Sequence, residues 1–166
     1  MNAEQVDTML REYKGNKARS EHLRLEIERV EQNLLMESSN AIANDAIHAQ
    51  QYSDMPHGSE VGRPVEDLVM KYAGGYVPPL VRGLQNELIA MRREYDLCIG
   101  CVRYVDAWMQ ALNEREQEVV TLQLIEGLYW SDVLYQLSKK YGLVFSKGGV
   151  RKIKARALEK MCAAAY

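Results

Sequence analysis

Residues 112–161 have the sequence LNEREQEVVTLQLIEGLYWSDVLYQLSKKYGLVFSKGGVRKIKARALEKM, which is the most informative stretch of the chain. It contains three segments whose apolar residues recur at three- and four-residue steps, which predicts three amphipathic helices. Glycine follows the first two segments, at Gly127 and Gly142, and its tolerance of a left-handed backbone favours the end of a helix there. The pattern therefore predicts three short helices around one small core.

Polar residues mark where these three helices begin. Asn113 can accept from a free backbone N–H while Glu116 reaches back to the N-cap, which is the pattern of a capping box. We expect the second helix to begin with Ser131 as its N-cap and the third to begin near Ser146. The residues of the third helix expected to face inward are Val150, Ile153, Ala157 and Met161. Its basic residues are then left on outward or flanking positions.

The end of this stretch carries much of the chain's positive charge. Between Lys139 and Lys160, eight basic residues stand against a single acid, Glu159, whereas the 166-residue chain has a net charge of −2. Clustered Lys and Arg neutralise DNA phosphates and release counterions, and the acidic remainder of the chain would be repelled by a duplex. A solvated basic helix would explain the charge alone equally well. Together with the three-helix pattern, the charge favours a DNA-binding surface.

The same stretch matches a known pattern at its helix starts and along its last helix. The matching residues are 112–116, Val119, Val120, Gly127, Ser146, 150–153 and 156–161. They resemble region four of bacterial sigma factors, which reads promoter DNA, and the resemblance covers about a third of the chain. It implies that the first turns of the last helix, from about residue 146 to 161, enter the major groove.

The resemblance also implies which residues contact DNA. Arg151 is expected to read a base, because an Arg can donate two hydrogen bonds to guanine, whereas nearby lysines more often contact phosphates. The expected DNA-binding residues are Lys139, Lys140, Ser146, Lys147, Gly148, Arg151, Lys152, Lys154 and Arg156. Two features depart from the family: residues 127–150 form a segment about six residues longer than usual, and Gly148 and Gly149 occupy the first turn. These glycines either weaken the helix start or allow close approach to a phosphate.

Two long helices are predicted ahead of residue 112. Apolar residues recur with a seven-residue repeat over residues 3–37 and again over residues 79–112. Helices of similar length can pack as an antiparallel hairpin within one chain, and the same seam can equally form a homodimer, so both arrangements stay open. Asn16 interrupts the first repeat, where it either sets the register of a buried seam or faces solvent.

Residues 38–78 have the composition of a connection. Ser, Asn, Asp, Pro and Gly gather at residues 38–40, 53–59 and 62–64. Residues 65–72 are expected to form a short helix that follows Pro64 and ends at a pair of glycines. The chain is therefore predicted to be all-α, with a helical hairpin or coiled-coil region at residues 1–111 and a helix-turn-helix DNA-binding domain at residues 112–166.

A helical N-terminal region, a connection that contains Asp54-Met55-Pro56 and a sigma-like C-terminal module occur together in this chain. This combination resembles the RinA/ArpU-like late-gene transcription activators of phages and prophages. The resemblance implies sequence-specific activation of phage structural and packaging genes, with double-stranded DNA as the partner and host RNA polymerase as a further contact. The alternatives are a DNA-packaging adaptor of the small-terminase type and a helical module that binds an acidic protein.

Metal and catalytic sites find little support in the sequence. Cys98 and Cys101 have the C-x2-C spacing, but Cys162 and the histidines are scattered, so we expect small buried thiols and no metal. The sequence has no phosphate-binding glycine loop, nucleophile elbow or H-E-x-x-H pair. His57 is a lone histidine in the Pro/Gly-rich segment, which is typical of a solvated side chain. We therefore expect neither an enzyme nor a cofactor.

The remaining signals concern the tryptophans and the location of the protein. Trp108 and Trp130 predict packing between helices, and the alternatives for Trp130 are docking of a polymerase subunit or a position near the DNA backbone. No apolar run has the length of a membrane span, and the N-terminus does not have the pattern of a secretion signal. The expected location is the cytoplasm of a bacterial host, without a membrane partner.

Overall fold

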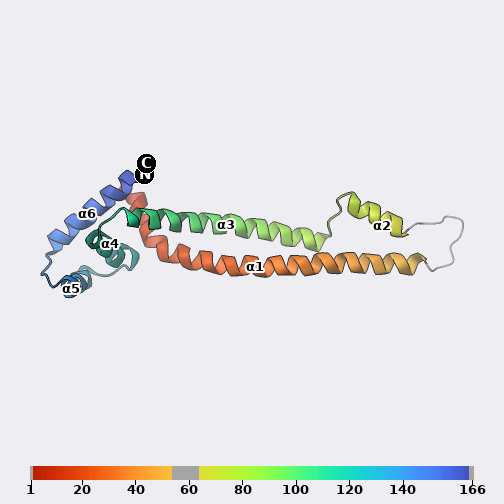
Figure 1. The fold of residues 1–166 in the computed structure, drawn as a ribbon, viewed down its shortest axis with the longest axis horizontal. Helices are drawn as coiled ribbons and strands as arrows, with labels where there is room; N and C mark the ends of the chain where they lie inside the picture. Colours follow the sequence, from red (N-terminus) through yellow and green to blue (C-terminus); the bar gives the residue numbers. More distant parts are fainter. Residues whose placement is uncertain (1, 54–63, 165–166) are drawn as a thin grey trace. The chain divides into compact units, whose positions relative to one another are not determined.

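Helices make up all the regular structure in the part of the chain that the computed structural model describes, residues 2–53 and 64–164 (Figure 1). They are α1 (Ala3–Ser53), α2 (Pro64–Ala73), α3 (Pro79–Gln110), α4 (Glu114–Val120), the π-helix η1 (Thr121–Ile125), α5 (Trp130–Tyr141) and α6 (Lys147–Ala164). The all-α prediction is confirmed for these residues. None of the helices within them has both the length and the apolar character needed to cross a bilayer.

The first helix continues well beyond its predicted end near residue 37. Ser38 and Ser39, which were expected in a connection, lie inside α1, and their Oγ atoms donate to the carbonyl oxygens of Leu34 and Leu35 at 2.6 and 2.9 Å. These bonds satisfy the hydroxyls within the helix, and the alanine-rich residues 41–49 favour its continuation. The prediction of a connection from residue 38 was therefore wrong. The motifs expected at residues 54–63, including His57, lie outside the described residues.

The next two helices follow the sequence pattern closely. The short helix expected at residues 65–72 is confirmed as α2, and the second long helix is confirmed as α3. Both begin with proline, at Pro64 and Pro79, because the first residue of a helix needs no backbone N–H donor.

The chain divides into two compact units. The terminal unit combines Met1–His22 with Tyr95–Tyr166, and the central unit spans Leu23–Glu94. This division differs from the expected one between residues 111 and 112. It differs because the first turns of α1 and the last turns of α3 pack with the C-terminal helices.

The terminal unit has a core that joins helices far apart in the sequence. Val6 and Leu10 of α1 have no exposed surface, and they belong to one cluster with Trp108 of α3 and with Ala157 and Met161 of α6. The position of Trp108 confirms the packing role predicted for it. The beginning of the chain is therefore part of the core on which the last helix rests.

A second core in the terminal unit lies among α4, η1, α5 and α6. Its buried residues are Val119, Leu122, Val133, Leu137 and Val150. Gly127 and Gly142 adopt positive φ angles of 69° and 63° after η1 and α5, which confirms the two predicted helix ends. The first segment is not one regular helix, because residues 121–125 form a π-helical turn that the sequence pattern did not predict.

The predicted start of the middle helix was wrong by two residues. Tyr129 is the N-cap of α5, and its carbonyl oxygen accepts from the backbone N–H groups of Asp132 and Val133 at 3.0 Å. Ser131 lies inside the first turn and does not cap the helix. The first hydrogen bonds of α5 are therefore made to the backbone carbonyl of Tyr129, and no side chain caps the helix.

The central unit has a smaller core. Its buried hydrophobic residues are Leu23, Val30, Val81 and Leu88. Asp45 of α1 accepts from Lys71 Nζ at 3.1 Å and from Tyr72 Oη at 2.9 Å, which ties α2 to α1. Polar contacts therefore supplement a short apolar seam in this unit.

Candidate nucleic-acid interface

The last helix, α6, has one buried side and one exposed side. Three of the four residues predicted to face inward, Val150, Ala157 and Met161, have no exposed surface, and the fourth, Ile153, is half-buried. The exposed residues on the other side are Lys147, Gly148, Arg151, Lys152, Ala155, Arg156 and Glu159. The fold therefore leaves Lys147, Arg151, Lys152 and Arg156 exposed on the outer side of the helix.

The beginning of α6 is held by the side chain of the residue before it. Ser146 Oγ accepts from the backbone N–H of Gly149 at 3.1 Å, as expected of an N-cap. A Cβ atom at position 149 would lie 3.2 Å from this Oγ, whereas a Cβ atom at position 148 would meet open space. Gly149 thus fits closely against the cap, and Gly148 leaves the outer surface of the first turn bare.

Small residues lie along the middle of the exposed side of α6. Gly148 and Ala155 are seven residues apart, so they lie on nearly the same side of the helix, and both are exposed. Arg151 and Lys152 lie one turn after Gly148, to either side of this line. This arrangement leaves room for the helix backbone to approach a surface closely, with the cationic Arg151 and Lys152 on either side of the bare line.

Arg151 is supported by an aromatic ring. Its Cζ atom lies 5.6 Å from the ring centroid of Trp130, at the beginning of α5, within the range of a cation–π interaction. Trp130 itself is half-buried and packs against the second core, in agreement with the packing role predicted for it. The sequence did not indicate this pairing, because the two residues lie on different helices.

Two of the predicted DNA-binding lysines are engaged in ion pairs within the protein. Lys140 donates to Glu118 and lies 3.8 Å from Glu114. The hydrogen bond from Lys140 to Glu118 raises the pKa of the Lys140 ammonium, which favours its charged form. Lys154 lies 3.4 Å from Asp7 of α1, and only 20% of its side chain is exposed. The charges of Lys140 and Lys154 are therefore paired within the protein, although 44% of the Lys140 side chain is exposed.

The other predicted residues are accessible. Lys139, Ser146, Lys147, Gly148, Arg151, Lys152 and Arg156 are all exposed. Among the described residues, Lys147 and Lys152 have no ion-pair or hydrogen-bond partner for their side chains. Their charges are therefore not neutralised by other described residues of the chain.

A buried carboxylate fastens α6 to the beginning of α4. Glu116 is 2% exposed and completes the predicted capping box: its side chain accepts from the backbone N–H of Asn113 at 3.1 Å, and its backbone N–H donates to Asn113 Oδ1 at 2.9 Å. Lys160 Nζ donates to both carboxylate oxygens at 2.9 and 2.7 Å. Burial by itself raises the pKa of Glu116, but the hydrogen bonds from Lys160 and Asn113 outweigh it and lower that pKa below its ordinary value.

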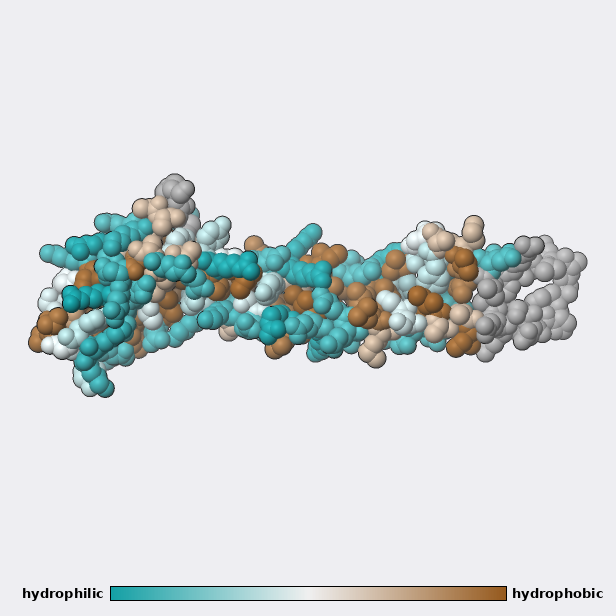
Figure 2. Space-filling model, in the orientation of Figure 1, coloured by the Kyte–Doolittle hydropathy of each residue, from teal (hydrophilic) through white to brown (hydrophobic). Residues whose placement is uncertain are grey.

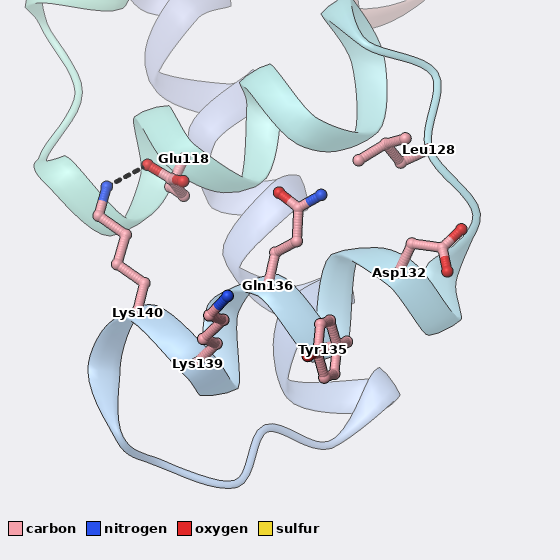
Figure 3. Close-up of a pocket in the computed structure, with 7 residues that line it drawn as sticks. All are labelled: Glu118, Leu128, Asp132, Tyr135, Gln136, Lys139 and Lys140. Carbon is pink, nitrogen blue, oxygen red and sulfur yellow. Dashed lines mark hydrogen bonds and ion pairs between the residues drawn. The ribbon is translucent and has the colours of Figure 1, made fainter.

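A groove of about 740 Å³ runs beside α5 (Figure 3). Its lining residues are Glu118, Leu128, Asp132, Tyr135, Gln136, Lys139 and Lys140. Five of them come from α5 and lie along one side of that helix, with the Lys140–Glu118 pair at one end. The lining is mostly polar, with two carboxylates, Glu118 and Asp132, and two lysines, Lys139 and Lys140.

The cysteines are dispersed in the structure. Cys98 and Cys101 lie on α3 and Cys162 lies on α6, and all three are free and half-buried. Within residues 2–53 and 64–164, no three His, Cys, Asp or Glu side chains lie close enough together to hold a metal ion.

The chain was compared with known protein families, curated proteins and solved structures, and none of them matches it.

Proposed function

We propose that residues 112–164 form a helix-turn-helix that binds double-stranded DNA, with α5 as the supporting helix and α6 in the major groove. The observation that carries this proposal is the division of α6 into a fully buried apolar side and an exposed side with Arg151, Lys152 and Arg156. The major groove, about 12 Å wide, admits a helix of this kind.

The arrangement suits both close approach and base recognition. Gly148 and Ala155 add almost no bulk along the outer line of α6, so the backbone can approach the base edges. Arg151 lies one turn into the helix and is restrained by Trp130, which reduces the rotamer freedom that it must give up on binding. We therefore assign base reading to Arg151, and phosphate contacts to Lys147, Lys152 and Lys139.

The same geometry limits the extent of the interface. Glu159 is exposed on the outer side of α6, two turns after Lys152, where a carboxylate would repel phosphates. Lys140 and Lys154 are excluded from the proposed contacts because their charges are already paired. DNA contact is thus expected over the first two to three turns of α6.

The biological role that we propose is transcription regulation, as in the RinA/ArpU-like phage activators that the sequence resembles. The finer architecture that accompanies it is a hairpin of α1 and α3. Contacts within each unit support this hairpin: Tyr13 Oη donates to Asp106 Oδ1 at 2.7 Å in the terminal unit, and Arg92 Nη2 donates to Glu31 Oε1 at 2.6 Å in the central unit.

The test begins with selection of bound duplexes from a random pool at physiological salt, followed by competition between the selected duplex and a scrambled one. Arg151→Ala should reduce discrimination between the two by about 5- to 150-fold, the equivalent of about 1–3 kcal/mol for one bidentate base contact. Lys139→Ala should weaken binding to both duplexes alike and reduce the salt slope by about one.

A charge control on the same helix separates recognition from general attraction. Glu159→Gln should tighten binding to both duplexes, because it removes a repulsive charge without adding a base contact. Equal losses of discrimination for Arg151→Ala and Lys139→Ala would remove the reading role from Arg151. Failure of the unaltered chain to bind any duplex even at low salt would overturn the proposed function.

A further inference from the structure

The central unit exposes many large hydrophobic side chains. It contains ten of the sixteen exposed large hydrophobic residues in the described part of the chain, and Figure 2 shows brown, hydrophobic residues at the surface of its helices. Large apolar patches at the surface of a protein mark places where another molecule binds. A binding surface requires several of these residues to lie on the same side of a helix.

Three of them lie in a straight line on α1. Leu25, Met36 and Ile47 are 56%, 63% and 52% exposed, and they are separated by steps of eleven residues. Eleven residues are close to three complete helical turns, so the three side chains lie on the same side of the helix. Leu23 and Val30, which α1 buries within the central unit, lie on the opposite side. We call the line from Leu25 through Met36 to Ile47, with the exposed residues on the same side of α1 between them, the outer stripe.

The residues of the outer stripe match those of a second, antiparallel copy of the stripe. Exposed residues at Arg29, Gln32, Asn40 and Ala43 fill the turns between the three apolar residues. When two copies of the stripe run antiparallel and are centred on Met36, Leu25 of one copy faces Ile47 of the other. In the same register Gln32 faces Asn40, two amides that can exchange hydrogen bonds, and Arg29 faces the small Ala43.

We propose that the outer stripe binds the outer stripe of a second copy of this chain, in an antiparallel two-fold dimer. A parallel dimer in register would place Arg29 against Arg29 along the seam, where like charges repel. The antiparallel register avoids that contact and pairs every apolar residue of the stripe with another. Such self-complementarity is the property of a two-fold interface, which uses the same patch on both subunits.

The intramolecular contacts leave this surface available. Leu23 and Val30, which belong to the heptad seam that the sequence offered to either a hairpin or a dimer, are already buried within the chain. A dimer therefore has to use the other side of α1. The polar residues in the stripe make it a poor surface for lipid.

Sedimentation of the full chain over a range of concentrations tests the proposal. The unaltered chain should shift from the mass of one chain to the mass of two, and Met36→Glu should raise the dissociation constant roughly tenfold or more, since it places two carboxylates together on the two-fold axis. Leu35→Glu is the matched control. Leu35 is 71% exposed but lies off the stripe, so this variant should dimerise like the unaltered chain.

The outcomes separate the alternatives. A chain that stays monomeric at all concentrations, a Met36→Glu variant that still dimerises or an eight- to twelve-fold ring, roughly the size of packaging adaptors, would each overturn the proposal. Loss of dimerisation in Leu35→Glu as well would remove the assignment to this stripe. Because both positions are exposed, helix content measured by circular dichroism should be the same in all three chains.

Cross-linking tests the direction of the helices. Chains in which Cys98, Cys101 and Cys162 are replaced by alanine would carry either Leu25→Cys or Ile47→Cys, and a short bis-maleimide would be added. A mixture of the two chains should give cross-linked dimers, whereas Leu25→Cys alone should give few. Efficient cross-linking of Leu25→Cys to itself would show a parallel pair and overturn the antiparallel dimer. Neither experiment involves DNA, so this proposal can fail while the proposed function stands.

Discussion

The terminal and central units differ in how completely they bury their hydrophobic residues. Of the nineteen buried hydrophobic residues in the described part of the chain, fifteen belong to the terminal unit and four to the central unit. Both units use the same long helices, α1 and α3, so helix formation itself does not explain the difference. In the terminal unit, α4, α5 and α6 add further layers, whereas in the described part of the central unit the ten-residue α2 is the one helix besides α1 and α3.

This comparison shows that the proposed DNA-binding module, residues 112–164, shares a core with the first turns of α1. Val6 and Leu10 at the start of the chain are in the same core as Ala157 and Met161 near its end. Asp7 also forms an ion pair with Lys154. Burial by itself raises the pKa of Asp7, but the hydrogen bond from Arg11 and the charge of Lys154 outweigh it and lower that pKa below its ordinary value. The first turns of α1 therefore stabilise the helix that presents Arg151.

The largest expected effect follows from removing one of these contacts. Leu10→Ala should lower the free energy of unfolding by about 2–5 kcal/mol, because it leaves a cavity where α1, α3 and α6 meet. Urea unfolding, followed by circular dichroism, would measure the change. DNA binding at a temperature where the variant is partly unfolded should fall in parallel, although Leu10 lies on none of the proposed contact surfaces.

Leu35→Ala in the central unit is the control for this change. Leu35 is 71% exposed, so the same truncation should change stability by less than about 0.5 kcal/mol. If Leu10→Ala were as mild as Leu35→Ala, the first turns of α1 would not be part of the core of the terminal unit, and the contrast between the two units would disappear.

Most of the C-terminal helices could be predicted from local signals. Asn113 with Glu116, Gly127 and Gly142 act on the backbone within a few residues of themselves, so their effects are readable in a single sequence. The helix boundaries were predicted wrongly where the residues form a different hydrogen bond from the one that the pattern suggested. Ser38 and Ser39 bond within α1 instead of ending it, and the carbonyl of Tyr129 satisfies the start of α5 in place of the Ser131 side chain.

The candidate site was less predictable than the fold. The basic character of α6 is plain from its composition, and the spacing of Val150, Ala157 and Met161 predicts which side of the helix faces outward. The state of each charge does not, since Lys154 is paired with a residue near the other end of the chain and Lys140 with residues on α4. Pairings between distant segments depend on tertiary structure, for which composition and periodicity carry no signal. The support of Arg151 by Trp130 belongs to the same class.

An intermediate effect is expected from Glu116→Gln in the terminal unit. The change removes the charge that accepts from Lys160 and Asn113, and it should cost about 1–2 kcal/mol near neutral pH. Because folding lowers the pKa of Glu116 from its ordinary value of 4.5, its contribution is present above that value and is lost as the pH falls through the lower pKa of the folded state. The difference between the two proteins should therefore shrink in acid.

Urea unfolding of both proteins between neutral and acidic pH would measure this dependence. Glu114→Gln provides a control at the same helix start, because the Glu114 side chain is 74% exposed and should matter by less than about 0.5 kcal/mol. A Glu116→Gln deficit that stays constant over the whole pH range would contradict the stabilising role of the ionised carboxylate.

The smallest effect is expected in the central unit, from the ion pair between Arg92 and Glu31. The atoms Arg92 Nη2 and Glu31 Oε1 are 2.6 Å apart, but 58% and 40% of the two side chains are exposed. Water and salt screen such a pair, so a double-mutant cycle of Arg92→Ala and Glu31→Ala should give a coupling of about 0–0.5 kcal/mol that decreases with added salt. The cycle would be measured by urea unfolding at one protein concentration. A coupling well above this range would mean that polar contacts compensate for the small apolar core of the central unit, and the need for a second copy on the outer stripe would be correspondingly weaker.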